Sequence, residues 1–137
     1  MRLWHQSLIK KLPRQQLLGQ HRECCALRGN GWGKKHSTVD YIFKYPPEYL
    51  IAYHFLVMIE MKERGYNVNE VWLNSRYRGK KCKEYDDLCD TFIELLIDYA
   101  RYEDNMIIAE HNDEYLNECI ENLRAKGIKL YIFILPD

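Results

Sequence analysis

A single carboxylate in a strongly basic stretch is the first feature of this sequence that suggests chemistry. Residues 1–44 hold nine Lys or Arg side chains but only two acids, Glu23 and Asp40. A carboxylate repels phosphates, so its place among phosphate-binding cations favours a chemical role, either moving a proton or stabilising a cationic intermediate. Composition leaves a second interpretation open, in which Glu23 forms an ion pair with Arg14 or Arg22 on a solvated helix.

The segment that carries Glu23 is predicted to be a helix over residues 14–28, with a proline before it and a glycine after it. At helical spacing, Gly19, Glu23 and Ala26 fall on one face. The carboxylate is thus flanked along the helix by two residues with almost no side chain. We expect this face to let a bulky group approach Glu23 closely.

Three further helices are predicted at about 47–64, 85–102 and 113–126, the last with Asp113 as its cap. Their apolar faces are formed by Leu50, Ile51, His54, Val57, Met58 and Met61; by Leu88, Phe92, Leu95, Leu96 and Tyr99; and by Leu116, Cys119, Ile120 and Leu123. The chain ends in an apolar, β-branched tail. We predict an all-α fold: one compact domain, 1–137, of three principal helices plus a shorter C-terminal helix and an extended tail.

The net charge of zero conceals a strong asymmetry along the chain. Residues 1–83 hold 16 basic and 6 acidic side chains, a balance of +10, whereas residues 84–137 hold 4 and 14, a balance of −10. Such a division indicates a polyanion partner for the N-terminal basic region and an intramolecular counterweight in the acidic C-terminal region. Two ordinary solvated faces that neutralise each other would give the same counts.

A metal site is the next possibility, because His21, Cys24, Cys25 and His36 lie close together in the sequence. No Cys-x-x-Cys pair is present, and adjacent cysteines on a helix point about 100° apart. We therefore predict no metal and assign Cys24 and Cys25 to a reduced, buried stripe, with His54 and Cys89 also in the core.

Two other features receive a structural interpretation. His111 precedes a helix cap and is expected to be part of local surface structure. Gly29, Gly31 and Gly33 match neither a P-loop nor a dinucleotide-binding fingerprint, so they indicate a helix end followed by a turn. The sequence shows no signal-peptide core and no run of 18 apolar residues, and we expect a cytoplasmic monomer with free thiols and no membrane contact.

Four short motifs occur in a fixed order in the first 80 residues: Met1-Arg2-Leu3-Trp4 at the start, QQLLGQHRE at residues 15–23, MKERGYNV at residues 61–68, and Tyr77-Arg78-Gly79. Together they resemble motifs of the phage-type pyrimidine-dimer DNA glycosylases. The first is similar to the family's basic-then-apolar start and the second to the family helix that carries an Arg-Glu pair. The third is similar to the end of the family's second long helix, and the fourth to an aromatic-Arg-Gly in the following loop. The resemblance covers roughly residues 1–80, and the acidic C-terminal third is not included.

The resemblance implies a compact all-α fold and a DNA-repair activity that needs no cofactor. One base of a pyrimidine dimer, or of a related lesion, would be removed from double-stranded DNA, and the strand would then be cleaved at the abasic site. The family's nucleophile is an N-terminal α-amine and its catalytic carboxylate matches Glu23. Because residue 2 is Arg, too bulky for ordinary removal of the initiator, the amine here would be that of Met1.

A set of cations is expected to bind DNA phosphates on one positive face, namely Arg2, Arg22, Arg28, Lys34, Lys35 and Arg78. Ala26 stands where the family has a further Arg. Two other function classes remain open at this point: a non-catalytic nucleic-acid-binding relative, and a helical interaction protein whose acidic half binds a basic partner.

Overall fold

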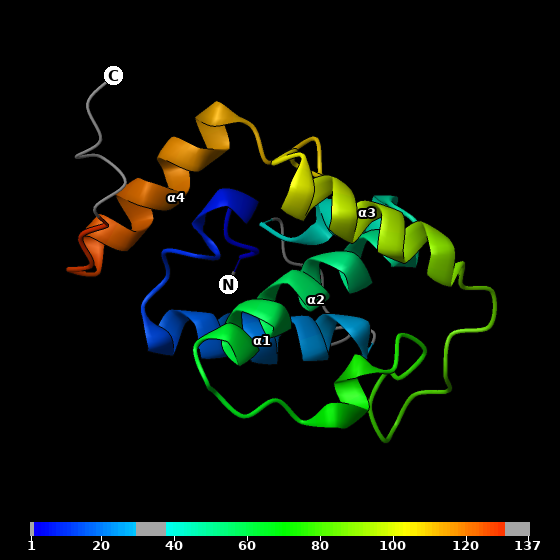
Figure 1. Ribbon diagram of the computed structural model, residues 1–137. Helices are drawn as coiled ribbons and strands as arrows, with labels where there is room; N and C mark the ends of the chain where they lie inside the picture. Colours follow the sequence, from blue (N-terminus) through cyan, green and yellow to red (C-terminus); the bar gives the residue numbers. More distant parts are fainter. Residues whose placement is uncertain (1, 30–37, 131–137) are drawn as a thin grey trace.

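The computed structural model describes residues 2–29 and 38–130, and over these ranges it contains helices and no strand (Figure 1). The α-helices are α1 (Arg14–Arg28), α2 (Pro47–Glu63), α3 (Asp90–Tyr102) and α4 (Asp113–Ala125). Short 3-10 helices occur at Gln6–Leu8, Asp40–Lys44 and Glu70–Leu73. The prediction of an all-α fold is confirmed.

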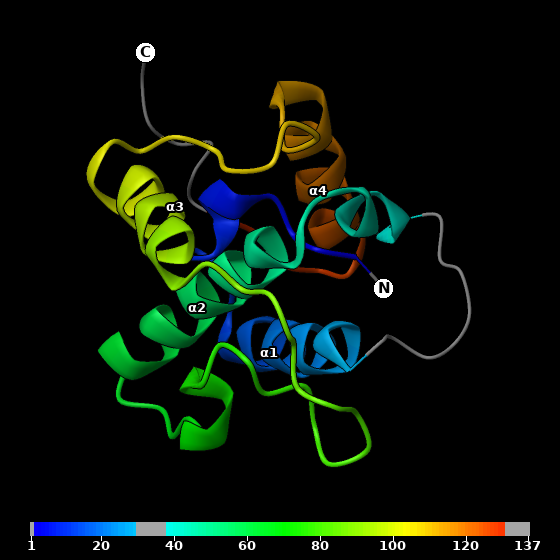
Figure 2. The same cartoon turned by 90° about the vertical axis from the view of Figure 1, so that its right-hand side faces the viewer.

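The central element is α2, which packs against α1 on one side and α3 on another (Figure 2). Pro47 occupies its first turn, where a missing N–H costs nothing, and the chain leaves it through Gly65 in the left-handed region at φ +82°. Every residue from Leu50 to His54 is buried, as expected for a helix covered on most of its surface. The predicted apolar face of this helix is confirmed throughout.

The N-terminal segment, residues 2–12, lies between α1 and α4 in both views (Figures 1 and 2). Leu3, Leu8 and Leu12 are almost completely buried in the same hydrophobic core that receives side chains from all four helices. Burial of one such side chain stabilises the fold by about 1.5–3 kcal/mol. The segment is therefore an integral layer of the fold.

The third helix begins later than predicted, at Asp90 instead of residue 85. Side chains from elsewhere hold the preceding backbone in an irregular path: Arg76 Nη1 donates to the carbonyls of Tyr85 and Asp86, and the Cys89 N–H donates to a Glu48 carboxylate oxygen at 3.0 Å. These bonds satisfy backbone groups without a helix. Cys89 is exposed, so the prediction that it is buried was wrong.

The buried face of α3 also differs from the prediction. Ile93, Leu96 and Ala100 face the core, whereas Leu95 is 59% exposed and Tyr99 43% exposed. Leu95 and Tyr99 are one helical turn apart, and so are Ile93, Leu96 and Ala100, so periodicity alone did not determine which of these two faces packs against α2.

The fourth helix matches the prediction apart from its cap. The side chain of Asn112, not Asp113, accepts the N–H of Tyr115 at 2.8 Å and acts as the N-cap. Gly127 follows the helix in the left-handed region at φ +81°, as a residue after the C-terminus often does. The predicted tail falls mostly on residues 131–137, outside the described residues.

His111 was predicted at the surface but is only 2% exposed. Its Nδ1 accepts the backbone N–H of Gln6 at 3.0 Å, and its Nε2 lies 2.8 Å from the hydroxyl of Tyr41. Burial is the main cause that lowers the pKa of His111 to about 3, so the ring is neutral at pH 7. The ring joins the loop before α4 to the N-terminal segment.

This buried ring makes stability depend on pH. Because the folded ring binds a proton only near pH 3 while the unfolded one binds it near 6.5, the contribution of His111 is complete above pH 6.5 and is lost as the pH falls towards 3. His111 contributes up to about 1.4 kcal/mol per pH unit to the slope, and His5, His21 and His54, whose pKa values burial also lowers, add to it. Urea unfolding at a series of pH values measures the slope. His111→Gln should make it shallower by up to the His111 contribution, and an unchanged slope in that variant would show that His111 does not contribute.

Candidate active site

A cleft of about 380 Å³ lies where α1, the N-terminal segment and the end of α4 meet. From α1 it receives Gly19 and Glu23, which are one helical turn apart. Arg2 and Trp4 line it from the N-terminal segment, and Lys126 lines it from the end of α4. The cleft thus joins the half-buried carboxylate of Glu23 with cations that lie far apart in the sequence.

The small-residue face predicted beside Glu23 is open at Gly19. A Cβ added there would meet only the flexible end of Arg22, at 3.7 Å. The absence of a side chain on Gly19 therefore leaves space in the cleft next to the carboxylate. Ala26, the other small residue of this face, is half-buried.

Gln20 anchors the N-terminal segment to α1. Its Oε1 accepts the N–H of Trp4 at 2.6 Å, and its Nε2 donates to the carbonyl of Arg2 at 3.0 Å. The hydroxyl of Tyr53 on α2 shares its single proton between Gln20 Oε1, at 2.8 Å, and the carbonyl of Trp4. Gln20 is 1% exposed, so these bonds replace the hydrogen bonds to water that its amide loses on burial.

This arrangement fixes the backbone that immediately follows Met1. Gln20 and Glu23 are three residues apart on α1 and therefore share one side of the helix. The residues bonded to Gln20 are the first that the structure describes, and Arg2 lines the cleft with Glu23. Met1 itself lies outside the described residues.

The predicted phosphate-binding cations do not all lie where they were expected. Arg2 lines the cleft, with its side chain 3.9 Å from Glu118 on α4, and Arg22 is exposed on α1. The half-buried Arg78 lies beyond the end of α1, where its Nε donates to the carbonyl of Arg28 at 2.8 Å. Lys34 and Lys35 fall outside the described residues.

Arg28 was expected on the positive face, and this prediction was wrong because the residue is completely buried. Its guanidinium donates to the carbonyls of Trp72, Asn74 and Tyr77 at 2.8–2.9 Å, and to Ser75 at 3.3 Å. Burial lowers the pKa of Arg28, but the group remains a cation whose charge is matched by carbonyl dipoles. Its role is to bind the loop after α2 to the end of α1.

The loop approaches α1 closely at this point. A Cβ on Gly29 would lie 2.9 Å from the carbonyl oxygen of Arg78, closer than real Cβ contacts. The carbonyl of Arg28 accepts from Arg78 and also from the hydroxyl of Tyr85. Glycine is therefore required at the end of α1 for packing, in addition to ending the helix.

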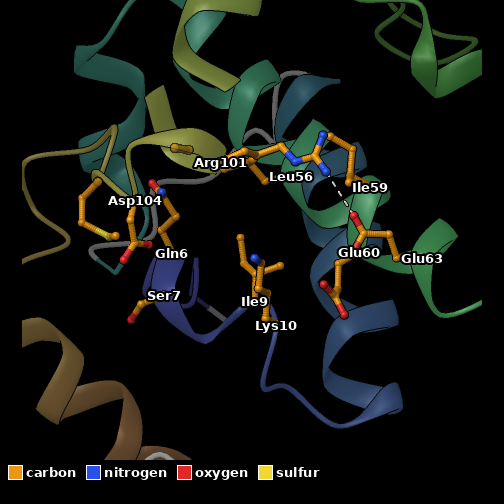
Figure 3. A pocket seen from close by; sticks show the side chains of 12 residues that line it. Gln6, Ser7, Ile9, Lys10, Leu56, Ile59, Glu60, Glu63, Arg101 and Asp104 are labelled. Carbon is orange, nitrogen blue, oxygen red and sulfur yellow. Dashed lines mark hydrogen bonds and ion pairs between the residues drawn. The ribbon is translucent and has the colours of Figure 1, made fainter. Parts of the chain in front are cut away.

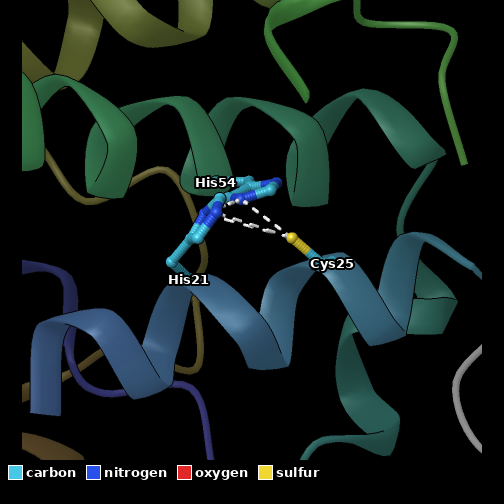
Figure 4. Close-up of side chains that lie close together, drawn as sticks. All are labelled: His21, Cys25 and His54. Atoms are coloured by element: carbon cyan, nitrogen blue, oxygen red, sulfur yellow. Dashed lines mark hydrogen bonds between the residues drawn. The ribbon is translucent and has the colours of Figure 1, made fainter. Parts of the chain in front are cut away.

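His21, Cys25 and His54 form a small cluster between α1 and α2 (Figure 4). Arg28 Nη1 lies 3.0 Å from His54 Nδ1, and because a guanidinium only donates, Nδ1 must accept. The proton of His54 is then on Nε2, from which it is donated to His21 Nδ1 at 2.8 Å. Burial and the nearby Arg28 lower the pKa of both histidines, so both are neutral.

The same geometry argues against a metal ion in this cluster. Coordination through His54 Nε2 would place a proton on Nδ1, where it would face the N–H of Arg28 instead of an acceptor. The buried cation of Arg28 would also repel the ion. Burial raises the pKa of the Cys25 thiol to about 11, so it is neither a ready ligand nor a ready nucleophile.

A separate hollow of about 260 Å³ lies on the α3 side of α2 (Figure 3). Glu60, Glu63 and Asp104 are among its lining residues, and Arg101 Nη2 pairs with Glu63 at 3.2 Å. Its carboxylates do not suit a phosphate-bearing ligand, and it receives no residue from α1. The Glu23 cleft is therefore the better candidate for the chemistry.

Comparison with known families shows to which family the chain belongs. Residues 1–74 match the family described as pyrimidine dimer DNA glycosylase. The match covers more than half of the chain, which therefore belongs to that family. It includes all of α1 and α2 and stops before α3 and α4.

No curated protein and no solved structure matches the chain significantly. Among the helices of residues 2–29 and 38–130, none is long and apolar enough to cross a membrane.

Sequence reasoning had missed three of the residues that build this cleft, namely Gln20, Asn122 and Lys126. Gln20 lies on the predicted helix, but its two bonds to residues 2–4 depend on how the segment folds back. Asn122 lies on α4 and Lys126 directly follows it, about 100 residues after Glu23, and no local signal connects either residue to Glu23.

Loss of the Arg28 guanidinium should destabilise the protein strongly. Arg28→Met keeps the stem but leaves buried carbonyls and His54 Nδ1 without a donor, which we expect to cost about 3 kcal/mol or more. Arg22→Met, an equal change at an exposed position of the same helix, should cost less than about 0.5 kcal/mol. Denaturant unfolding of both variants tests this, and similar unfolding free energies would contradict the assigned role.

Proposed function

We propose that this protein is a DNA glycosylase and abasic-site lyase that acts on pyrimidine dimers or a related lesion in double-stranded DNA. Membership in the family supports the glycosylase role. The observation that supports the mechanism is the anchoring of residues 2–4 by Gln20, because Arg2, the neighbour of Met1 in the sequence, lines the cleft that contains Glu23.

The proposed nucleophile is the α-amine of Met1. An α-amine has a pKa near 8, against about 10.4 for Lys, so a useful fraction is unprotonated at neutral pH. Its nitrogen attacks C1′ of the damaged nucleotide, the bond from C1′ to the base breaks, and the base leaves with the bonding electrons and takes up a proton. The sugar ring then opens to an iminium linked to the amine.

Glu23 is proposed to act on that intermediate. Its carboxylate stabilises the positive charge of the iminium and accepts the proton lost from C2′. Removal of this proton expels the 3′ phosphate and cleaves the strand, and water later releases the enzyme. The open space beside Gly19 gives the sugar access to the carboxylate.

Binding of DNA is assigned to the cations at and around the cleft. Arg2 is the proposed phosphate contact inside it, and Arg22 and Arg78 are proposed contacts outside it, together with Lys34 and Lys35. The target nucleotide must leave the base stack to reach Glu23. The proposal includes a monomeric, single-domain, cytoplasmic enzyme without a cofactor.

A non-catalytic DNA-binding relative is the second candidate, and Ala26 is the observation that favours it. The family resemblance places an Arg at this position, and alanine supplies no charge for a phosphate or an intermediate. Such a protein would bind DNA with a strong dependence on salt but would form no covalent intermediate.

Trapping of the intermediate separates these two candidates. With borohydride present, the wild-type protein should become covalently linked to duplex DNA that contains an abasic site, because the iminium is reduced to a stable amine. A protein acetylated at the α-amine, or extended at its N-terminus, should lose this product but keep its fold. Full lyase activity in the extended protein would exclude the N-terminal mechanism.

The carboxylate is tested separately. Glu23→Gln keeps the shape and the hydrogen-bonding capacity of the side chain but removes its charge, so turnover should fall by at least about 100-fold. DNA binding should be retained or become tighter, because a charge that repels phosphates has been removed. Single-turnover cleavage and equilibrium binding measure the two effects. Activity near that of the wild type would exclude Glu23 as the catalytic carboxylate.

A further inference from the structure

The Glu23 cleft adjoins a second hollow of opposite character. Arg2 and Thr38 line both, so the two spaces share a border. The second hollow has a volume of about 570 Å³ and is lined by the carboxylates of Glu110, Glu114 and Glu118. The backbone of a DNA strand bound at the Glu23 cleft would therefore run either along this hollow or away from it.

The helix α4 contributes to both spaces, with a different charge in each. Lys126, immediately after α4, lines the Glu23 cleft, whereas Glu114 and Glu118 from its first half line the second hollow. Lys126 is exposed, and its Nζ lies 5.5 Å from the centre of the Trp4 ring. The start of α4 therefore presents negative charge to the second hollow, and the residue after its end presents positive charge to the Glu23 cleft.

Lys126 and Arg2 lie over the same aromatic ring. The guanidinium carbon of Arg2 is 5.8 Å from the centre of the Trp4 ring, comparable with the distance for Lys126. Cation–π contacts of this kind position both charges at the cleft. The exposed ammonium of Lys126 keeps its donors open to solvent, whereas the guanidinium of Arg2 also lies 3.9 Å from Glu118. Two cations beside one carboxylate are well placed for two phosphates on either side of a nucleotide that Glu23 acts on.

The second hollow would repel the same phosphates. Glu118 is 64% exposed in its side chain and lies 3.9 Å from Arg2, and Glu114 is also exposed. At physiological salt, charges act over about 8 Å, so carboxylates that line a hollow are felt throughout a space of this size. One side of the cleft is therefore favourable to a DNA backbone and the other is not.

We propose that α4 sets the path of the DNA backbone across the cleft, with Lys126 binding a phosphate beside the reacting nucleotide and Glu114 and Glu118 keeping phosphates out of the adjoining hollow. This inference rests on the proposed function. It assigns substrate contacts to a helix that lies outside residues 1–74, the part matched by the family. It also gives the acidic C-terminal region a role in the placement of DNA.

Matched substitutions at the two ends of α4 test the proposal. Lys126→Gln removes the cation in the cleft, and Lys129→Gln is its control, because Lys129 is exposed and lines neither hollow. Glu114→Gln removes a charge from the second hollow, and Asp113→Asn is the control in the same helical turn. The affinity of each protein for duplex DNA with a tetrahydrofuran abasic-site analogue is measured over a range of salt concentrations.

The two ends of the helix should give effects of opposite sign. Lys126→Gln should weaken binding and reduce the slope of log affinity against log salt by about one. Glu114→Gln should strengthen binding, most of all at low salt, where repulsion is least screened. Each control removes a charge outside the hollows and should change the affinity much less than its partner substitution. A purely structural role of α4 predicts weaker binding, if any change, for all four proteins.

Each result bears on a definite claim. If the wild-type protein does not bind the duplex, both this inference and the proposed function are wrong. If it binds and the borohydride trap succeeds, but Lys126→Gln behaves like Lys129→Gln, or Glu114→Gln like Asp113→Asn, only the path along α4 is wrong. Opposite shifts at the two ends, each much larger than the shift of its control, support the proposal.

Discussion

The candidate active site depends on one buried amide, that of Gln20. A segment near the end of a chain has many conformations, and fixing one residue of backbone costs about 1–2 kcal/mol, so specific bonds are needed to hold it in one place. Gln20 supplies an acceptor to Trp4 and a donor to Arg2, and Tyr53 binds the same amide oxygen from α2. The position of residues 2–4 thus follows from the packing of α1 on α2.

The basic residues of this chain serve two physically different purposes. A guanidinium has five donors and cannot be deprotonated at ordinary pH, so it can stay buried where several carbonyls converge, as Arg28 does. Arg22 and Lys126 remain exposed and can exchange water for phosphate oxygens. A count of charges along the sequence cannot separate these purposes, although only the exposed cations contribute to binding of a polyanion.

The sequence was sufficient to predict features that depend on interactions between residues close together in the chain. The helical period placed Glu23 and Gly19 on one face, and both line the cleft. The same reasoning placed the apolar face of α2 correctly, because a helix covered on most sides leaves little choice of face. Short-range rules were sufficient where one element determines the result.

The failures involve partners distant in the sequence. Arg28 was assigned to the surface because cations usually lie there, and its carbonyl acceptors are more than 40 residues away. His111 is buried by contacts with Gln6 and Tyr41, and Lys126 reaches the cleft only because α4 packs over the N-terminal segment. None of these contacts has a signature in the local sequence.

The carbonyl ligands of Arg28 have a consequence for local unfolding. Residues 72–77 have little regular structure, yet several of their carbonyls are bound to a side chain of the last turn of α1, and the carbonyl of Arg28 is bound in return by Arg78. Neither part can separate from the other without exposing buried polar groups on both. The loop and the helix end therefore open as one cooperative unit, and the irregular loop acquires the protection against hydrogen exchange that belongs to the helix.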